Sequence, residues 1–387
     1  MFRILFRRLM SVLVFLLLGN SLIAAPSFLG ISPNANGEYV IKSAIDLKGR
    51  KVSVPTAAVL RFDGGSLKNG ILVGQNSYVS ASQCQVFYNV EFLGRFCSTF
   101  EMEWIGAKAD NKTDNSDCFN KAFGTNAVLS WHAGCGWYVL KKPVHITQNV
   151  RFKCDGKIKA DGVVGDLLSI ESHDVCLDID EMWTAEGRER SAANAIGIVA
   201  NSQYNNITIR RISGFNKGIN LAPRAVKTAK AGISYNVFTW QRITCNECLV
   251  FDLNGPNDGT GLWITENQFN GGQLEGGIGL VQHGQNDKSS RIHGNVFNCM
   301  AFEGLDVPVK GLYRWYSDFF YDTRMSTGEN QPAKYYIEMT NCEDVHFRIK
   351  AKLASDRIYT KNCTACEFIT ADKEYLSGRK DTPDTKK

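Results

Sequence analysis

Short runs of alternating apolar and polar residues, broken by Gly, Asn and Asp, recur along most of the chain. Asn267–Gly276 and Asn295–Gly304 match at Asn, Phe, Asn, a large apolar residue, Glu and Gly, and they begin 28 residues apart. A second echo, 21 residues apart, joins the segments that begin at Asn341 and Asn362. The segment that begins at Asn236 shares the frame of the first two segments, and weaker copies begin at residues 172 and 205. Such alternation is typical of half-buried strands, so the pattern predicts repeated units of short β-strands.

A repeat of this length predicts a solenoid, in which each unit is one coil that buries its apolar face on its neighbours. Pro is scarce, with 9 residues against 35 Gly. Scarce Pro fits central strands, whose N–H groups must all donate to neighbouring strands, and abundant Gly fits the bends between them. We therefore expect an all-β fold of roughly ten coils. The alternative is a β-sandwich, which has short strands but gives no reason for echoes this far apart.

Two segments carry a family resemblance. Residues 104–123 resemble the G-A-x-G-D-G-x-T-D-D opening of the pectate-lyase superfamily, which includes polygalacturonases, exoglucanases and phage tailspikes, although Ala109 and Asn111 replace two of its Gly residues. Residues 136–146 are similar to the first coil of the same family, and residues 60–74 to an extra N-terminal coil of exported β-helix proteins. The resemblance implies a right-handed parallel β-helix, a single-stranded solenoid with a short N-terminal capping helix. It implies no particular reaction, because one fold supports many functions.

The expected capping helix follows Thr113 and Asp114, either of which can cap its first turn. Phe119, Ala122 and Phe123 then form an apolar stripe. We expect this stripe to cover the open end of the solenoid.

The N-terminus has the pattern of a secretory signal peptide. Basic residues precede an apolar run from Leu9 to Leu18, and Ala24 and Ala25 follow at a plausible cleavage site. An uncleaved N-terminal anchor is the alternative. We expect a signal peptide over 1–25, an extra β-coil or cap region over 26–103, the β-helix over 104–372 and a polar tail over 373–387. The mature protein would be secreted or periplasmic, without stable membrane insertion.

Charge and composition exclude several classes of protein. Loss of the three Arg residues of the signal peptide lowers the formal net charge from +5 to +2, which is no signature of a nucleic-acid partner. With 44% hydrophobic residues, the chain has ample material for a core, so it is not a disordered protein. The sequence leaves the oligomeric state open.

Glu275 and Glu303 are the candidate catalytic residues, because they occupy the same place in matching units. In the strand alternation they point outward, and stacked strands would place their backbones about 4.8 Å apart. Two carboxylates that close do not both ionise easily, so one would have a raised pKa and could act as a general acid in glycosidic-bond cleavage. The alternative is structural, with each Glu accepting hydrogen bonds from turn N–H groups. The inward positions of the two units are Phe269, Phe297, Leu274 and Phe302.

Candidate substrate-binding residues are dense between residues 258 and 322. Aromatic faces can stack on sugar rings, and Arg pairs well with the carboxylate of a uronate. The alternative for each of them is an ordinary core or surface position. The candidates are Trp263, Glu266, His283, Arg291, Trp315 and Tyr316, with His293 and Asp318 beside them.

These features predict an exported polysaccharide-processing protein, with a glycoside hydrolase acting on an acidic polysaccharide as the leading hypothesis. A polysaccharide lyase is the first alternative, supported by the basic pair Arg210 and Arg211 and by His283. A non-catalytic glycan-binding or surface-structural β-helix is the second, because no complete catalytic signature is present. We predict no cofactor and no metal, except Ca²⁺ if the protein is a lyase.

Twelve cysteines in an exported chain raise the question of disulfides. Cys299, Cys342 and Cys363 lie inside the repeat units, where a small apolar side chain can pack between coils. We therefore expect mostly free, buried thiols, with one or two bridges at most.

Overall fold

The computed structural model describes residues 27–185, 194–223, 231–254, 261–284, 291–326, 334–350, 353, 355–371 and 374–376. The expected signal peptide and most of the expected polar tail lie outside these residues. No helix within the described ranges is long and apolar enough to cross a membrane.

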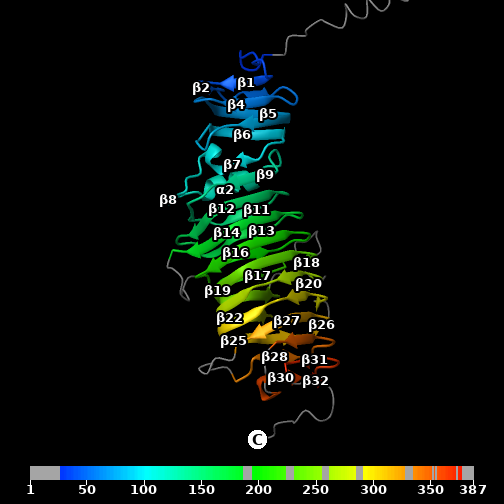
Figure 1. Cartoon of the computed structure of the whole chain (residues 1–387). Helices are drawn as coiled ribbons and strands as arrows, with labels where there is room; N and C mark the ends of the chain where they lie inside the picture. Colours follow the sequence, from blue (N-terminus) through cyan, green and yellow to red (C-terminus); the bar gives the residue numbers. More distant parts are fainter. Residues whose placement is uncertain are drawn as a thin grey trace, which may run out of the picture.

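The described chain is an elongated stack of parallel strands, in which the strand numbers rise from one end to the other (Figure 1). The first group consists of β1 (Glu38–Ile41), β2 (Ala44–Asp46), β3 (Lys51–Ser53), β4 (Val59–Phe62), β5 (Ser66–Ser80) and β6 (Phe87–Phe96). A second, four-stranded group consists of β18 (Ala231–Ser234), β20 (Leu262–Thr265), β23 (Arg291–His293) and β26 (Trp315–Tyr316).

The main sheet has 22 strands. They are β7 (Phe100–Glu101), β8 (Asp110–Asp114), β9 (Ser130–Ala133), β10 (Trp137–Leu140), β11 (Val144–Ile146), β12 (Arg151–Ala160), β13 (Gly165–Ile170), β14 (Cys176–Thr184), β15 (Ala195–Ala200), β16 (Asn206–Ser213), β17 (Lys217–Leu221), β19 (Val237–Asp252), β21 (Gln268–Asn270), β22 (Gln273–His283), β24 (Val296–Asn298), β25 (Ala301–Tyr313), β27 (Phe319–Met325), β28 (Ile337–Thr340), β29 (His346–Ile349), β30 (Ile358–Lys361), β31 (Glu367–Ile369) and β32 (Glu374–Leu376). Two 3₁₀ turns, η1 (Met102–Ile105) and η2 (Ser355–Arg357), and the helix α2 (Ser116–Phe123) complete the described elements.

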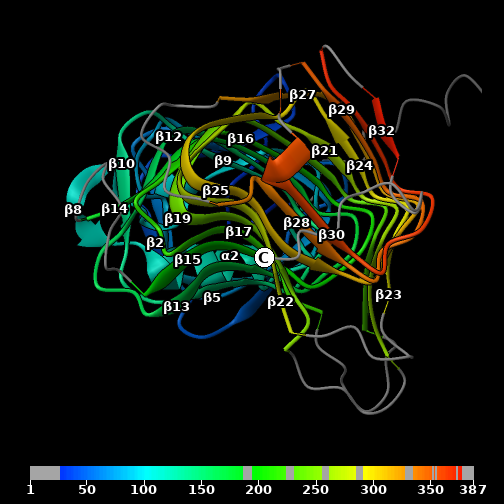
Figure 2. The ribbon, with the colours of Figure 1, turned by 90° about the horizontal axis from the view of Figure 1, so that it is seen from below.

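Strands pair in parallel with the strand one repeat later. β14 pairs with β16, β16 with β19, β19 with β22 and β22 with β25, while β31 and β32 are antiparallel. Viewed along the stack, strands of successive repeats therefore lie over one another (Figure 2). The expectation of an all-β fold is confirmed, and the parallel pairing shows that the alternative of an antiparallel sandwich is wrong.

The repeat units of the sequence are in register in the structure. Phe269 pairs with Phe297 and Leu274 with Phe302, and all four side chains are buried, as the alternation predicts. Six phenylalanines of successive repeats stack into one column inside the protein, with neighbouring ring centroids 4.0 to 5.4 Å apart. These six are Phe238, Phe269, Phe297, Phe320, Phe347 and Phe368.

A ladder of buried amides runs beside the phenylalanine column. From the second member onward, the side-chain oxygen of each Asn accepts a hydrogen bond from the backbone N–H of the Asn one repeat earlier, at 2.9 to 3.1 Å. Asp318 ends this series and accepts from both the backbone N–H and the side-chain amide of Asn295, at 2.8 and 2.9 Å. The residue before each of these positions has a positive φ or is Gly, so the ladder satisfies polar groups at a tight bend. The members are Asn205, Asn236, Asn267, Asn295 and Asp318.

The helix α2 forms where the sequence predicts it, but its environment differs from the prediction. Asp114 accepts a 3.0 Å hydrogen bond from the backbone N–H of Ser116, whereas Thr113 hydrogen-bonds to Asp110. Phe119 and Phe123 pack on Phe152 of the main sheet. On its other side the helix faces β6 of the six-stranded group. It therefore lies between that group and the main sheet and does not cover an open end (Figure 1).

Candidate functional site

The two predicted catalytic residues lie on adjacent strands. Glu275 of β22 and Glu303 of β25 directly follow the paired residues Leu274 and Phe302, and the register shifts after this pair. Both side chains are partly exposed. The structure therefore places the two glutamates on neighbouring strands with partly exposed side chains.

Each of the two carboxylates has a different side-chain partner. Arg242 of β19 donates to Glu275 from Nε at 2.8 Å and also from its terminal nitrogen, and Thr244 donates at 3.3 Å. The side-chain amide of Gln273 donates to Glu303 at 2.7 Å. Both carboxylates thus bond to side chains of the preceding repeat. A cation neighbours one glutamate and a neutral amide the other.

A row of charged residues leads from the first repeats to Glu275. Lys157 of β12 pairs in register with Glu181 of β14, Glu181 with Arg211 of β16, and Arg211 with Arg242 of β19. These residues are register partners on neighbouring strands, so the spacing of their backbones follows the strand separation of about 4.8 Å. We call these four residues, together with Arg210 and Glu275, the charged strip.

Glu181 anchors the strip as a buried carboxylate. Its side chain is only 4% exposed, yet it accepts hydrogen bonds from Lys157 at 2.8 Å, from the indole N–H of Trp183 at 2.8 Å and from Arg210. Burial alone would raise the pKa of Glu181, but these three donors outweigh it and the pKa is lowered. Glu181 is therefore ionised at neutral pH and fixes the cations around it.

Two tryptophans lie under the cations of the strip. The Lys157 ammonium is 5.0 Å from the ring centroid of Trp137, and the Arg211 guanidinium is 5.9 Å from that of Trp183. Both distances are within the range of cation–π attraction. The side chains of Lys157, Arg211 and Arg242 are 35%, 30% and 43% exposed, so they remain accessible to a ligand.

A groove of about 450 Å³ opens beside the strip, over β12, β14, β16 and β19. Arg210 lies at its border and holds Asp180 with both ends of its guanidinium. The hydrogen bonds to Asp180 are the main cause that raises the pKa of Arg210. Asp155 and Asp178 also line the groove, with Thr208 and Thr239. Arg210 is the residue that the strip and the groove share.

The predicted substrate-binding residues do not lie on the strip. Most of them belong to the four-stranded group or to its bends, and His283 belongs to β22. Trp263 and Arg291 pair in register in the four-stranded group, and His293 pairs with Tyr316 there. The Trp263 ring covers Gly232 of the preceding repeat, where a Cβ atom would come within 1.9 Å of the indole nitrogen. Glu266 lies at the following bend and hydrogen-bonds to Tyr235, which raises the pKa of that tyrosine. His283 ends β22 and pairs with Glu247 at 2.8 Å.

Two of the predicted contacts are wrong. Trp315 is fully buried among the phenylalanines and donates its indole N–H to Gln282 at 2.7 Å. Asp318 is fully buried as the last member of the amide ladder. Neither side chain reaches the surface, so they are core residues and not sugar contacts.

The charged strip was not predicted as a unit from the sequence, although Arg210 and Arg211 were named as a basic pair. The signal was present in the repeats. Arg211 and Arg242 occupy the same position relative to Asn205 and Asn236, and each precedes an Ile. Aligning the first half of the chain on these repeats would have placed the two arginines in one column.

All twelve cysteines are free thiols in the structure, so the one or two disulfides allowed for are not formed. Cys342 and Cys363 are buried as expected, but Cys299 is exposed at a bend with a φ of 54°. Among the described residues no group of three or more His, Cys, Asp and Glu is placed to hold a metal ion. No protein-family model, curated protein or solved structure matches the chain.

Proposed function

We propose that this chain is a right-handed parallel β-helix that binds and processes an acidic polysaccharide along the charged strip. Parallel pairing at offsets of 21 to 31 residues supports the solenoid. Connections between parallel strands of one sheet are right-handed in about 98% of cases, which supports the hand. The N-terminal sequence supports export, with the mature protein secreted or periplasmic.

The single observation that carries the substrate class is the alignment of three cations in one row, with the carboxylate of Glu181 between Lys157 and Arg211. Lys157, Arg211 and Arg242 occupy the same point of their coils, are partly exposed, and follow one line along the stack. A linear polymer with a carboxylate on successive sugars presents matching charges along a line, and Arg binds a carboxylate through two parallel hydrogen bonds.

We place cleavage at Glu275 and Glu303, at the end of the strip. Glycoside hydrolases use two carboxyl groups, one as the acid and the other as the base or nucleophile. Glu275, whose partner is a cation, is assigned as base or nucleophile. Glu303, whose partner is a neutral amide, is assigned as the acid. As the glycosidic bond breaks, Glu303 protonates the leaving oxygen. The hydroxyl of a water molecule bonds to the sugar, and the remaining proton of that water goes to the carboxylate that acts as the base.

Incubation with a panel of uronate-containing and neutral polysaccharides tests this assignment. We expect new reducing ends from an acidic polysaccharide, and a loss of about a hundredfold or more in rate in Glu275→Gln and Glu303→Gln, because each change removes a proton-transfer group. Gln273→Ala is the matched control, because it removes the partner of Glu303 and keeps the carboxylate. Binding without reducing ends would refute hydrolysis.

A lyase is the second candidate, and Arg210 and Arg211 favour it. Arg210 lines the groove and Arg211 follows it on β16, where cations could neutralise a uronate carboxylate during β-elimination. β-Elimination breaks the same bond but leaves an unsaturated uronate, which absorbs ultraviolet light. Reducing ends accompanied by this absorbance, and abolished by Arg211→Ala, would therefore replace the hydrolase assignment with a lyase.

A further inference from the structure

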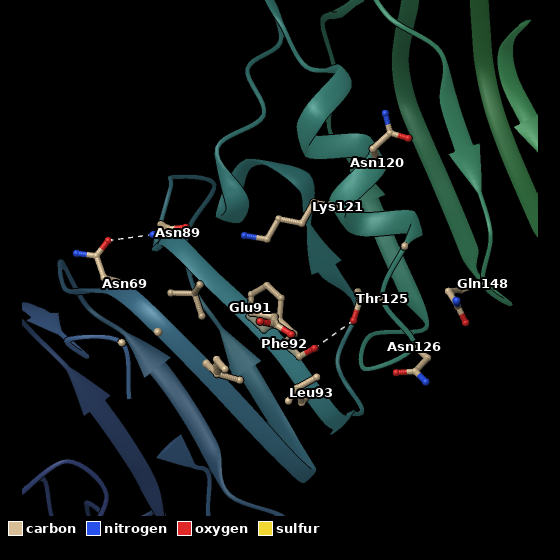
Figure 3. Close-up of a pocket in the computed structure, with 15 residues that line it drawn as sticks. Asn69, Asn89, Glu91, Phe92, Leu93, Asn120, Lys121, Thr125, Asn126 and Gln148 are labelled. Carbon is tan, nitrogen blue, oxygen red and sulfur yellow. Dashed lines mark hydrogen bonds between the residues drawn. The ribbon is translucent and has the colours of Figure 1, made fainter. Parts of the chain in front are cut away.

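A second groove, of about 750 Å³, lies between the N-terminal strands and the helix α2 (Figure 3). Residues Asn89 to Leu93 of β6 form one wall, and the end of α2 with residues 124–126 forms the other. Gln148, Gly49 and residues 69–71 complete the lining. The volume is within the range of small-molecule binding sites, about 300 to 1,000 Å³.

Carboxamide side chains surround this groove on both walls. Asn126 and Gln148 make no hydrogen bond within the described part of the chain, and Asn89 donates to Asn69 at 3.3 Å while its own oxygen stays available. Asn120 is engaged, because it donates to the carbonyl of Pro143 at 2.9 Å. A carboxamide both donates and accepts, so the three available amides offer paired donors and acceptors to a ligand.

The groove carries no net charge of its own. Lys121 extends from α2 across the gap toward β6 (Figure 3), and its ammonium lies 5.7 Å from the ring centroid of Phe92. Burial lowers the pKa of Lys121, and the nearby carboxylate of Glu91 counteracts this effect. The charges of one cation and one carboxylate thus cancel in this groove. The charged strip differs, because it has four cations and two carboxylates.

The backbone of β6 is a poor template for a peptide strand. Asn89 and Gly94 have φ values of 53° and 71°, so only Val90 to Leu93 remain extended between two bends. The carbonyl of Phe92 already accepts a hydrogen bond from the Thr125 hydroxyl at 3.3 Å. An added strand needs a longer free edge than this. We therefore expect a ligand in the groove to be bound by the side-chain amides and not by the backbone of β6.

We propose that this groove is a second glycan site, which binds an uncharged oligosaccharide through Asn89, Asn126 and Gln148. Sugar hydroxyls donate and accept like the amides that would meet them, and an uncharged ligand fits the balanced pair of Lys121 and Glu91. An apolar ligand would leave the amides unpaired, and a polyanion would meet a single cation that already has a carboxylate near it. The site is independent of the charged strip and goes beyond the function proposed for it.

Calorimetric titration with uncharged hexasaccharides of glucose, xylose and mannose tests the proposal. We expect at least one of them to bind, and the double variant Asn126→Ala, Gln148→Ala to weaken that binding by about tenfold or more, since each lost hydrogen bond contributes about 0.5 to 1.5 kcal/mol. Neither residue bonds to the described part of the protein, so the melting temperature should not change. Arg211→Ala, in the charged strip, is the control and should bind the hexasaccharide like the wild type.

Salt dependence gives an independent outcome, because binding of an uncharged sugar should be insensitive to ionic strength. The proposal is overturned if none of the three hexasaccharides binds, if the double variant binds them like the wild type, or if Arg211→Ala abolishes the binding. It is also overturned if a library of extended peptides binds at the groove and the sugars do not. A failure of the charged strip to bind acidic polysaccharide would leave this result unaffected.

Discussion

Replacing Asp318 with Asn should make the protein more resistant to alkaline conditions. Asp318 ends a ladder of asparagines, and its second oxygen is buried without a hydrogen-bond partner among the described residues. Burial raises the pKa of Asp318 to about 8, which exceeds the lowering by hydrogen bonds from Asn295 and Tyr316. At neutral pH the side chain is mainly a neutral acid that imitates the amide of the other ladder members.

The register explains what the neutral acid replaces. Asn267 donates its amide N–H to the carbonyl of Ile233, and Asn295 donates to that of Ile264, both at 3.0 Å. Ile264 pairs with Ile292 in the next repeat. The equivalent acceptor for Asp318 is therefore the Ile292 carbonyl, and the amide introduced by Asp318→Asn could donate to it at every pH.

The sign of the pH dependence follows from the raised pKa. The folded protein holds a proton on Asp318 that the unfolded chain, with an ordinary pKa of 3.8, releases. The stability that this group contributes is complete below about pH 4 and is lost as the pH rises to about 8, by about 1.4 kcal/mol for each pH unit. Across this window the difference between wild type and Asp318→Asn should grow by several kcal/mol, on the order of 5.

Urea unfolding of both proteins between about pH 4 and pH 9 measures this difference. The midpoint of the wild type should fall relative to that of Asp318→Asn as the pH rises. Asp344→Asn is the control in the adjacent repeat. Hydrogen bonds from His346 and Ser317 lower the pKa of Asp344, so its carboxyl group is ionised in both the folded and the unfolded chain across this range and does not itself cause a pH dependence. If the urea midpoints of wild type and Asp318→Asn change with pH in the same way, Asp318 is not protonated in the folded protein at neutral pH.

Phe297→Ala should cause the largest loss of stability from the core. The Phe297 ring is fully buried and stacks between Phe269 at 4.7 Å and Phe320 at 4.2 Å. Removing it leaves a cavity in the middle of the column, and substitutions of this kind cost about 3 to 5 kcal/mol. Phe297→Leu retains more of the volume and should cost less.

Chemical denaturation with the same probe for each variant gives the comparison. Tyr78→Ala is the control for loss of an aromatic ring, because Tyr78 is 43% exposed, and it should change the stability by about 0.5 kcal/mol or less. Equal effects for Phe297→Ala and Tyr78→Ala would contradict the continuous column.

The repeats that the sequence displays are those that the stacking requires. The shared Asn and Phe of the units that begin at 267 and 295 are the ladder and column residues, so their spacing predicts register, inward side chains and all-β structure. The ladder continues to Asp318 only 23 residues later, and there a carboxyl group replaces the amide. Because both the spacing and the residue type change at this position, the repeat pattern did not identify Asp318 as a ladder residue. It was predicted to be a surface residue instead.

Residues of the surface were harder to predict, because nothing in a single repeat specifies what an outward side chain meets. Glu275 and Glu303 were placed on neighbouring strands correctly, yet their partners Arg242 and Gln273 come from the preceding repeat. Glu181 looked like any acidic residue in the sequence. It can be buried as a carboxylate only because Lys157, Trp183 and Arg210, on three neighbouring strands, all donate hydrogen bonds to it.

Binding of an acidic polysaccharide to the charged strip underlies the whole proposed function. Calorimetric titration with a hexamer of galacturonate measures this binding, with wild type compared to the double variant Arg211→Ala, Arg242→Ala and to the control Lys141→Ala. Lys141 is exposed and pairs with Asp161, outside the strip. We predict binding by wild type and control that weakens with salt, and a loss of about a hundredfold in the double variant. Binding of equal strength in all three proteins, or none in the wild type, would contradict the proposed role of the strip.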